Sequence, residues 1–146
     1  MNLQFEQDRA KRPDLFYFLG AIPAEELDAW LRHKGFVVPE DLKKFWCQTG
    51  GGELFETETM LSPFGRTDLA DDIESVNLFH RQSGMPVDWL VFHTGIGGLS
   101  VVKMLAGQYA SVQEGSYQVQ QTFSSLADWY AGLLRREYAA RYGLQE

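Results

Sequence analysis

Histidine and cysteine are the residue types of this chain best suited to metal or nucleophilic chemistry. The three histidines, His33, His80 and His93, are far apart in the sequence, and Cys47 is the only cysteine. A structural zinc site normally takes four such ligands at short, repeated spacings. A nucleophilic cysteine needs a positive or basic neighbour that lowers the pKa of its thiol, and the sequence names none for Cys47. The sequence therefore predicts neither a metal centre nor a bound cofactor.

The spacing of the other polar residues gives no support to hydrolysis or phosphate binding. Glu53, Glu56 and Glu58 alternate imperfectly, whereas a glycosidase holds two carboxyl groups on opposite sides of its substrate. No Gly-x-Ser-x-Gly nucleophile elbow occurs. The segment Gly95-Ile-Gly-Gly98 lacks the following helix and the Lys-Ser/Thr pair of a phosphate loop, which favours a hairpin turn. We therefore predict that the chain is not an enzyme.

Acidic residues are concentrated in the middle of the chain. The formal net charge is -7, and residues 53–88 contain eight acidic residues against two basic ones. This charge argues against nucleic acid or an anionic membrane as a direct partner and favours a basic protein. The competing interpretation is a solvated surface that only keeps the protein soluble. The predicted partner-binding residues are Glu53, Phe55, Glu56, Glu58, Asp68, Asp71, Asp72 and Glu74.

Phe55 is included because an aromatic anchor supplies binding energy that charge alone does not. The four tryptophans fall on predicted core faces, so we expect them to be buried rather than to contact a partner. Phe55 lies inside the acidic segment and is the better candidate for an exposed anchor. The alternative is that its ring forms a lid over the core next to the glycines that precede it.

Length and composition indicate one folded domain over residues 1–146. Hydrophobic residues make up 45% of the chain, and there is no repeat or low-complexity tract. The apolar run Leu15–Leu19 is much shorter than the roughly 20 residues that span a bilayer, and no export leader precedes it. With a single cysteine no intramolecular disulfide can form, so we expect a cytoplasmic protein. The core is predicted at about 22–143, and within the extension 1–21 the aromatic run Leu15–Leu19 fits either a short strand or a helical turn.

Two helices with clear start and stop signals are expected in the first third of the chain. The first covers residues 23–34, with proline and acidic residues at its start and Gly35 after its end. The second runs from Pro39 to a run of three glycines that begins at Gly50. Its apolar residues at helical spacing, Leu42, Phe45 and Trp46, predict one buried face.

A third helix is predicted over residues 68–82. Asp68 is suited to the N-cap, and Leu69, Ile73 and Val76 repeat at the spacing of a buried helical face. The exposed side of this helix would then carry the acidic residues of the segment, Asp71, Asp72 and Glu74.

The second half of the chain changes to a strand pattern. Residues 89–93 are almost wholly apolar, as expected for a central strand that is covered on both faces. Three more short segments at even spacing predict an antiparallel meander: 99–105, 108–113 and 117–122. A last helix opens near Phe123, with Ser125 and Asp128 at capping-box spacing, and continues to about Gly143. The predicted fold class is α+β, with helices packed against one antiparallel meander sheet.

Several of these segments together resemble one known family. The helix ending in Thr49-Gly-Gly-Gly52, the hairpin Leu90-Val-Phe-His-Thr-Gly-Ile-Gly-Gly98, the meander and the closing helix from Phe123 resemble the SUKH superfamily over about residues 22–135. This superfamily is named after the fungal Smi and Knr regulators of cell-wall synthesis. Its members often carry an acidic residue directly after the hairpin glycines, where this chain has Leu99. A family site at that turn is therefore not carried over.

The resemblance implies an α+β domain that has no catalytic activity and binds another protein. Many bacterial members look like immunity proteins, which neutralise toxins, often nucleases, that competing cells deliver. We therefore expect an immunity protein that binds a basic toxin domain. The alternative is a regulatory module that binds a cellular protein, as the fungal members do. The oligomeric state stays open, because Tyr138 and Tyr142 could pair subunits or pack on the sheet.

Overall fold

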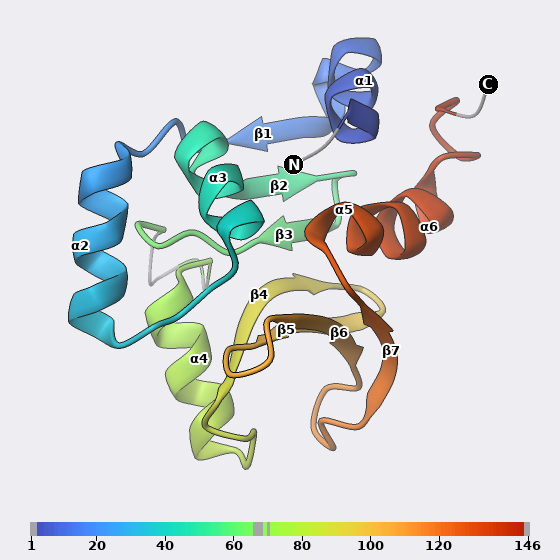
Figure 1. Ribbon diagram of the computed structural model, residues 1–146. Helices are drawn as coiled ribbons and strands as arrows, with labels where there is room; N and C mark the ends of the chain where they lie inside the picture. The colour runs from blue at the N-terminus through green and yellow to red at the C-terminus, as the bar shows by residue number, and fades with distance from the viewer. Residues whose placement is uncertain (1–2, 66–68, 70, 145–146) are drawn as a thin grey trace.

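A single antiparallel sheet forms the centre of the molecule (Figure 1). The computed structural model describes residues 3–65, 69 and 71–144. The strands are β1 (Phe16–Phe18), β2 (Gly52–Leu54), β3 (Glu58–Met60), β4 (Trp89–Gly95), β5 (Gly98–Lys103), β6 (Gln108–Val112) and β7 (Val119–Phe123). Their order in the sheet follows their order in the chain. The predicted α+β class is confirmed, and the meander extends beyond the second half of the chain because β1 to β3 continue it.

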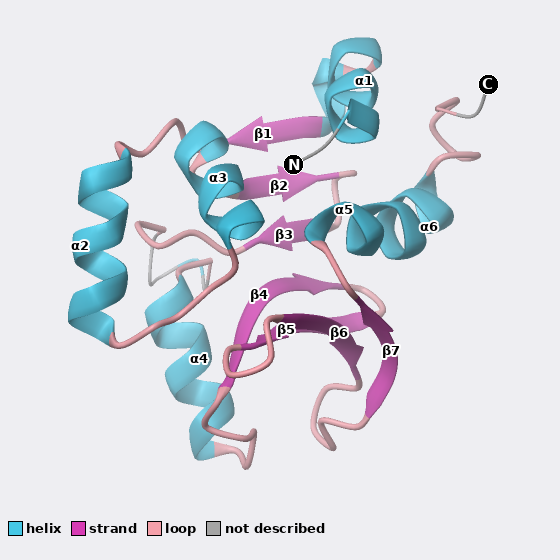
Figure 2. Cartoon of the chain, in the orientation of Figure 1, coloured by secondary structure: helices cyan, strands magenta, loops and turns pink. Residues whose placement is uncertain are grey.

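The helices surround this sheet, as the secondary-structure colouring of Figure 2 shows. They are α1 (Leu3–Lys11), α2 (Ala24–Lys34), α3 (Glu40–Thr49), α4 (Ile73–Gln82), α5 (Leu126–Trp129) and α6 (Arg136–Tyr138). A π-helical segment, Tyr130–Arg135, joins α5 to α6 without a break. We call the continuous unit from 126 to 138 the C-terminal helix. It begins where the sequence predicted, because the Asp128 amide donates to the Ser125 hydroxyl at 3.0 Å.

The N-terminal segment belongs to the core. Residues 16–18 form a strand that pairs with β2. Of the two structures expected for the aromatic run of this segment, the strand is therefore the one observed. Phe5 of α1 is buried, and its ring contacts those of Phe16, Phe45 and Tyr130 at centroid distances of 5.5, 5.8 and 5.5 Å. These edge-to-face contacts join α1 to β1, α3 and the C-terminal helix. The hydrophobic core therefore includes residues before position 22.

The run of glycines after α3 allows three backbone segments to approach closely. Gly50 takes a left-handed φ of 77°, and its amide donates to the Trp46 carbonyl at 2.8 Å, which ends the helix as predicted. A Cβ at Gly50 would collide with the carbonyl oxygen of Gly20, and one at Gly52 with that of Tyr17. Side chains at these two positions would push the N-terminal segment away from β2.

The start of α4 was predicted wrongly. The helix begins at Ile73 rather than near residue 68, and its N-cap is Asp72, whose carboxylate accepts from the Ser75 amide at 2.8 Å. Asp68 lies outside the described residues. Leu69 is 60% exposed instead of buried. The reason is a parallel bridge between Ser62 and Asp72, which holds Asp72 extended and prevents the helix from starting earlier.

Strands β4 to β6 are covered on both faces, whereas β7 is mostly exposed. Consecutive residues of β4, β5 and β6 are buried, as predicted for a central strand at 89–93. The side-chain amide of Asn77 on α4 bonds both to the amide of Val91 at 2.7 Å and to its carbonyl at 3.0 Å. Because β3 pairs with β4 only near His93, Asn77 takes the place of a strand partner at the bulge that follows Val91.

Candidate functional site

The predicted acidic face is divided in the structure. Glu53, Glu56 and Glu74 are exposed, and Asp71 is half-buried. Glu56 lies in the turn before β3, whereas Glu74 lies in the first turn of α4, beyond the other end of β3. Glu74 also forms an ion pair with Lys34, which offsets part of its charge. These acidic side chains therefore form at least two separate patches.

Phe55 is not an exposed anchor. Its side chain is 0% exposed, and its ring stacks against three tyrosine rings, those of Tyr130, Tyr138 and Tyr142, at centroid distances of 6.3, 5.0 and 5.9 Å. The backbone takes left-handed φ values at Phe55 and Glu56, where the chain turns between β2 and β3. The Phe55 ring instead covers the core, which was the alternative expected from the sequence. The rings of Tyr138 and Tyr142 pack inward as well.

Two of the predicted contact acids are buried as structural acceptors. Asp72 is the N-cap of α4 and faces its own helix rather than solvent. Glu58, at the start of β3, is 4% exposed. Neither carboxylate is on the surface as predicted. The physical cause is the same for both: each charge lies where backbone or side-chain donors converge on it. Glu58 is the centre of the most extensive of these arrangements.

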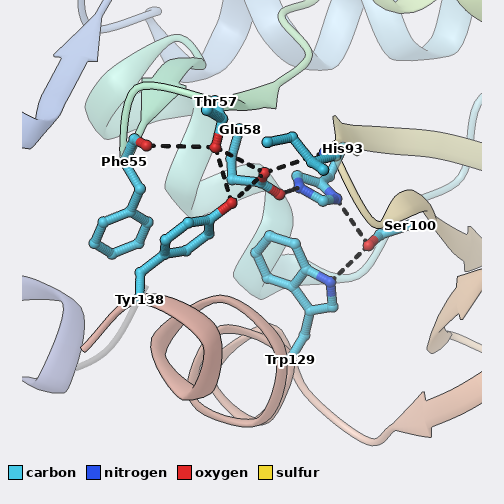
Figure 3. Close-up of polar contacts among 8 residues, drawn as sticks. Phe55, Thr57, Glu58, His93, Ser100, Trp129 and Tyr138 are labelled. Carbon is cyan, nitrogen blue, oxygen red and sulfur yellow. Dashed lines mark hydrogen bonds and ion pairs between the residues drawn. The ribbon is translucent and has the colours of Figure 1, made fainter. Parts of the chain in front are cut away.

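Several hydrogen-bond donors converge on the Glu58 carboxylate (Figure 3). Its Oε1 atom accepts from His93 Nε2 at 2.8 Å. Its Oε2 atom accepts from the Tyr138 hydroxyl at 2.8 Å and from the Ile96 amide at 3.3 Å. The Thr57 hydroxyl lies 3.2 Å from Oε2 and 2.8 Å from the Tyr138 oxygen, and its single hydrogen can go to only one of them at a time. These bonds join β3, β4, the β4–β5 turn and the C-terminal helix at one point.

The chain of hydrogen bonds continues from His93 to the indole of Trp129. Ser100 Oγ lies 2.9 Å from His93 Nδ1 and 2.9 Å from Trp129 Nε1. The indole can only donate, so Ser100 accepts from it. The Ser100 oxygen has a second lone pair, so its hydrogen bond with His93 Nδ1 can run in either direction. An ionised carboxylate can only accept, so His93 donates to Glu58 through the ring proton on Nε2.

Glu58 is ionised at neutral pH. Burial by itself would raise the pKa of its carboxyl, but the bonds from His93 and Tyr138 and from the Ile96 amide stabilise the charged form and bring the pKa below its usual value. Burial, together with the bond to Glu58, raises the pKa of the Tyr138 hydroxyl, which therefore stays protonated and keeps donating.

A pocket of about 290 Å³ opens beside this cluster, between the β4–β5 hairpin and the C-terminal helix. Its lining comprises Glu58, His93, Ile96, Gly97, Gly98, Leu99, Ser100, Ser111, Gln120, Leu133, Leu134, Glu137, Tyr138 and Arg141. The helical residues share one face at and after the π-helical segment, a type of irregularity that is frequent at functional sites. Gly95 lies directly against the Glu58 carboxylate, because a Cβ at this position would collide with it.

Ser100, His93 and Glu58 stand in the order of a catalytic triad, but the geometry does not favour nucleophilic catalysis. Ser100 is 0% exposed, and its oxygen already accepts a hydrogen bond from Trp129. The arrangement is better suited to holding the hairpin and the C-terminal helix in place around the pocket.

The remaining candidate residues of the sequence do not come together. His33 is exposed, while His80 is buried and lies 2.8 Å from the Tyr117 hydroxyl. Burial raises the pKa of the Cys47 thiol, which disfavours the reactive thiolate. Within the part of the chain that the structure describes, no three histidine, cysteine or carboxylate side chains are grouped so that they could hold a metal ion.

Comparison with known protein families matches residues 21–132 to the SMI1 / KNR4 family (SUKH-1). The chain belongs to this family. SUKH proteins are generally non-catalytic and act through protein–protein interaction. Comparison with curated proteins and with solved structures finds no match. No helix among the described residues has the length and apolar character needed to cross a membrane.

The matched region contains most of the polar cluster but not the whole pocket. Glu58, His93, Ser100 and Trp129 lie inside residues 21–132, whereas the pocket wall from Leu133 onward lies beyond them. The site could not be recognised from the sequence, because its residues look ordinary in isolation. Glu58 was assigned to a surface, His93 to a core strand, and Ser100 was not singled out. A histidine inside an otherwise apolar central strand was the one available signal.

Proposed function

We propose that this SUKH protein is a cytoplasmic immunity protein, which binds and neutralises a bacterial toxin domain that has a basic surface. The observation that carries the proposal is the family match over residues 21–132, because it covers more than half of the chain and the family acts by binding proteins. The buried position of Ser100 agrees with binding rather than catalysis. Neither nucleic acid nor a membrane is a direct partner in this proposal, because the net charge is -7.

The exposed acidic side chains supply the electrostatic attraction. Glu53 and Glu56 remain on the surface at the β2–β3 hairpin, and Glu74 and Asp71 form a second patch at α4. A nuclease toxin presents positive charge to bind phosphates, so an acidic inhibitor is complementary to the rim of its active site. Clustered charge of this kind accelerates encounter and selects partners, and its effect decreases with salt.

Co-expression with a toxin domain tests the proposal, and a toxin reading frame directly upstream of this chain would be the one to use. Cells that express the toxin should survive only when this protein is also expressed. Death in both cases, with the protein folded and abundant, would exclude an immunity role against that toxin. A regulatory module acting on a cellular protein would likewise give no rescue, and it would co-purify with a host protein in the absence of any toxin.

A matched pair of double variants tests the acidic surface. Glu53→Lys/Glu56→Lys and Glu25→Lys/Glu26→Lys change the net charge equally, and all four side chains are exposed. At low salt the first pair should weaken toxin binding at least tenfold and the second less than threefold. Equal losses would mean that net charge matters and the position of the acidic patch does not.

A further inference from the structure

Glu58 carries a buried negative charge, and no lysine or arginine among the described residues pairs with it. Its only ion-pair partner among these residues is His93, which is charged only when it is protonated. The other donors, Tyr138, Thr57 and the Ile96 amide, are uncharged. Buried charges in proteins are nearly always paired, because removing an ion from water is costly even after the protein relaxes. A carboxylate held in this way attracts a positive charge from outside.

The pocket provides a route for such a charge to reach Glu58. Glu58 is part of the pocket lining, and its Oε1 atom accepts only one hydrogen bond among the described residues, so that it can accept another. Leu99, Leu133 and Leu134 provide apolar wall. A long side chain with an apolar stem and a charged end matches this combination. The volume of about 290 Å³ is at the lower limit of ligand pockets and suits one side chain better than a larger molecule.

The charges at the mouth partly offset each other. Glu137 and Arg141 lie one helical turn apart, line the pocket and are exposed. The Arg141 guanidinium lies 5.2 Å from the centre of the Tyr138 ring. It forms no ion pair with either glutamate within the part of the chain that the structure describes. Arg141 therefore opposes an entering cation without neutralising Glu58, and Glu137 favours one.

We propose that this pocket binds one arginine side chain of the partner protein, with the guanidinium as the counter-ion of Glu58 and the stem against the leucines. Arginine is favoured over lysine because its planar, weakly hydrated head group is better suited to a buried ion pair. Arginine is also among the residues that most often anchor interfaces by filling a pocket near their centre. The identity of the occupant as part of a toxin rests on the proposed function; the preference for a guanidinium does not.

A titration of the full chain with a small probe tests the pocket directly. N-acetyl-arginine methylamide and N-acetyl-citrulline methylamide have nearly the same shape, but only the first is charged. Amide NMR spectra at constant ionic strength should show saturable shifts at Ile96, Gly97 and Gly98 and at the Trp129 indole with the arginine probe. The citrulline probe should bind at least tenfold more weakly. Equal binding of the two probes, or shifts confined to other residues, would overturn the proposal.

Three variants locate the binding. Glu58→Gln keeps the shape of the side chain and should weaken arginine binding at least tenfold, whereas Arg141→Gln should strengthen it about threefold. Leu133→Trp leaves the polar cluster intact and should abolish binding by filling the pocket, which keeps the test valid if Glu58→Gln folds poorly. Undiminished binding by a folded Leu133→Trp protein would contradict the proposal.

Different experimental outcomes would exclude the immunity role and the arginine-binding pocket. If co-expression gives no rescue but the arginine probe binds at the pocket, the immunity role is excluded and the guanidinium site stands. If rescue occurs but the probe does not bind, or Leu133→Trp rescues as well as the unchanged protein, the pocket is not where the toxin is held.

Discussion

Asp8 and Glu58 are two buried carboxylates whose environments differ in one respect. Asp8, on α1, is 2% exposed and accepts from the Tyr130 hydroxyl at 2.7 Å and from Arg135 Nε at 3.0 Å. Glu58 also accepts from a tyrosine of the C-terminal helix, but its ion-pair partner is a histidine rather than an arginine. Both carboxylates attach a distant part of the chain to this helix. Of the two, only Asp8 is paired with a permanently charged side chain among the described residues.

The two carboxylates therefore differ in whether the fold itself supplies a permanent counter-ion. The charge of Asp8 is satisfied within the fold by Arg135, so the contact has no need of a ligand. The charge of Glu58 is stabilised by hydrogen bonds and faces a pocket that the fold leaves unfilled. We therefore expect the first site to contribute more to stability and the second to recognition. Four changes test this comparison, beginning with the largest expected effect.

Removal of the charge at Asp8 should cost the most stability. Asp8→Asn leaves the Arg135 guanidinium without its partner, and we expect a loss of about 3 kcal/mol in the free energy of unfolding, measured by urea denaturation. Asp14→Asn is the control, because Asp14 pairs with Arg12 on the surface and the change should leave stability nearly unaltered. A small effect at Asp8 would show that its ion pair is not a structural contact.

An added methyl group at Gly95 should disturb the Glu58 site from the hairpin side. Gly95→Ala places a Cβ against the Glu58 carboxylate, and we expect a loss of about 2 kcal/mol from overpacking. Gly97 is the matched control in the same turn, because a Cβ there meets no atom within 4 Å. Gly97→Ala should change stability by no more than about 0.5 kcal/mol. Equal effects would mean that the Glu58 carboxylate is not held against the hairpin.

Glu58→Gln should cost less than Asp8→Asn. The substitution weakens the bonds from His93 and Tyr138 but also removes a buried charge that no lysine or arginine among the described residues neutralises, so the two effects partly cancel. We expect a net loss of about 1 kcal/mol in thermal or urea unfolding. A loss as large as that of Asp8→Asn would indicate that Glu58 is neutralised inside the fold, and the comparison of the two carboxylates would fail.

The smallest expected effect is the pH dependence of the same variant. The pKa of Glu58 is lowered in the folded state from its usual value of 4.5, so its contribution to stability is complete above about pH 4.5 and is lost as the pH falls through the folded-state pKa. The stability advantage of the unchanged protein over Glu58→Gln should therefore shrink below pH 4.5. Unfolding curves from pH 7 to pH 3 measure it, and an advantage that is constant or grows would contradict the assignment.

Much of the fold could be predicted from local sequence patterns. The helical stripe of Leu42, Phe45 and Trp46 is fully buried, and Gly50 ends its helix as expected. Ser125 caps the last helix. These predictions are confirmed because periodicity, capping and glycine conformation depend on residues within a few positions of one another.

The candidate site could not be predicted in the same way. Phe55 looked like an anchor in an acidic loop, but its burial depends on tyrosines of the C-terminal helix. The start of α4 depends on the bridge between Ser62 and Asp72 rather than on the helical spacing of Leu69. In both cases a contact between separate segments decided the outcome.

Local sequence patterns were enough to predict the fold class, the meander, most helix ends and the excess of negative charge in the middle of the chain. Contacts between distant segments decide which of those charges reach solvent and which one lies at a pocket. His93 is 35 residues from Glu58 in the chain, and Tyr138 is 80 residues from it. The environment of a carboxylate is set by such distant donors, and a sequence pattern records only near neighbours.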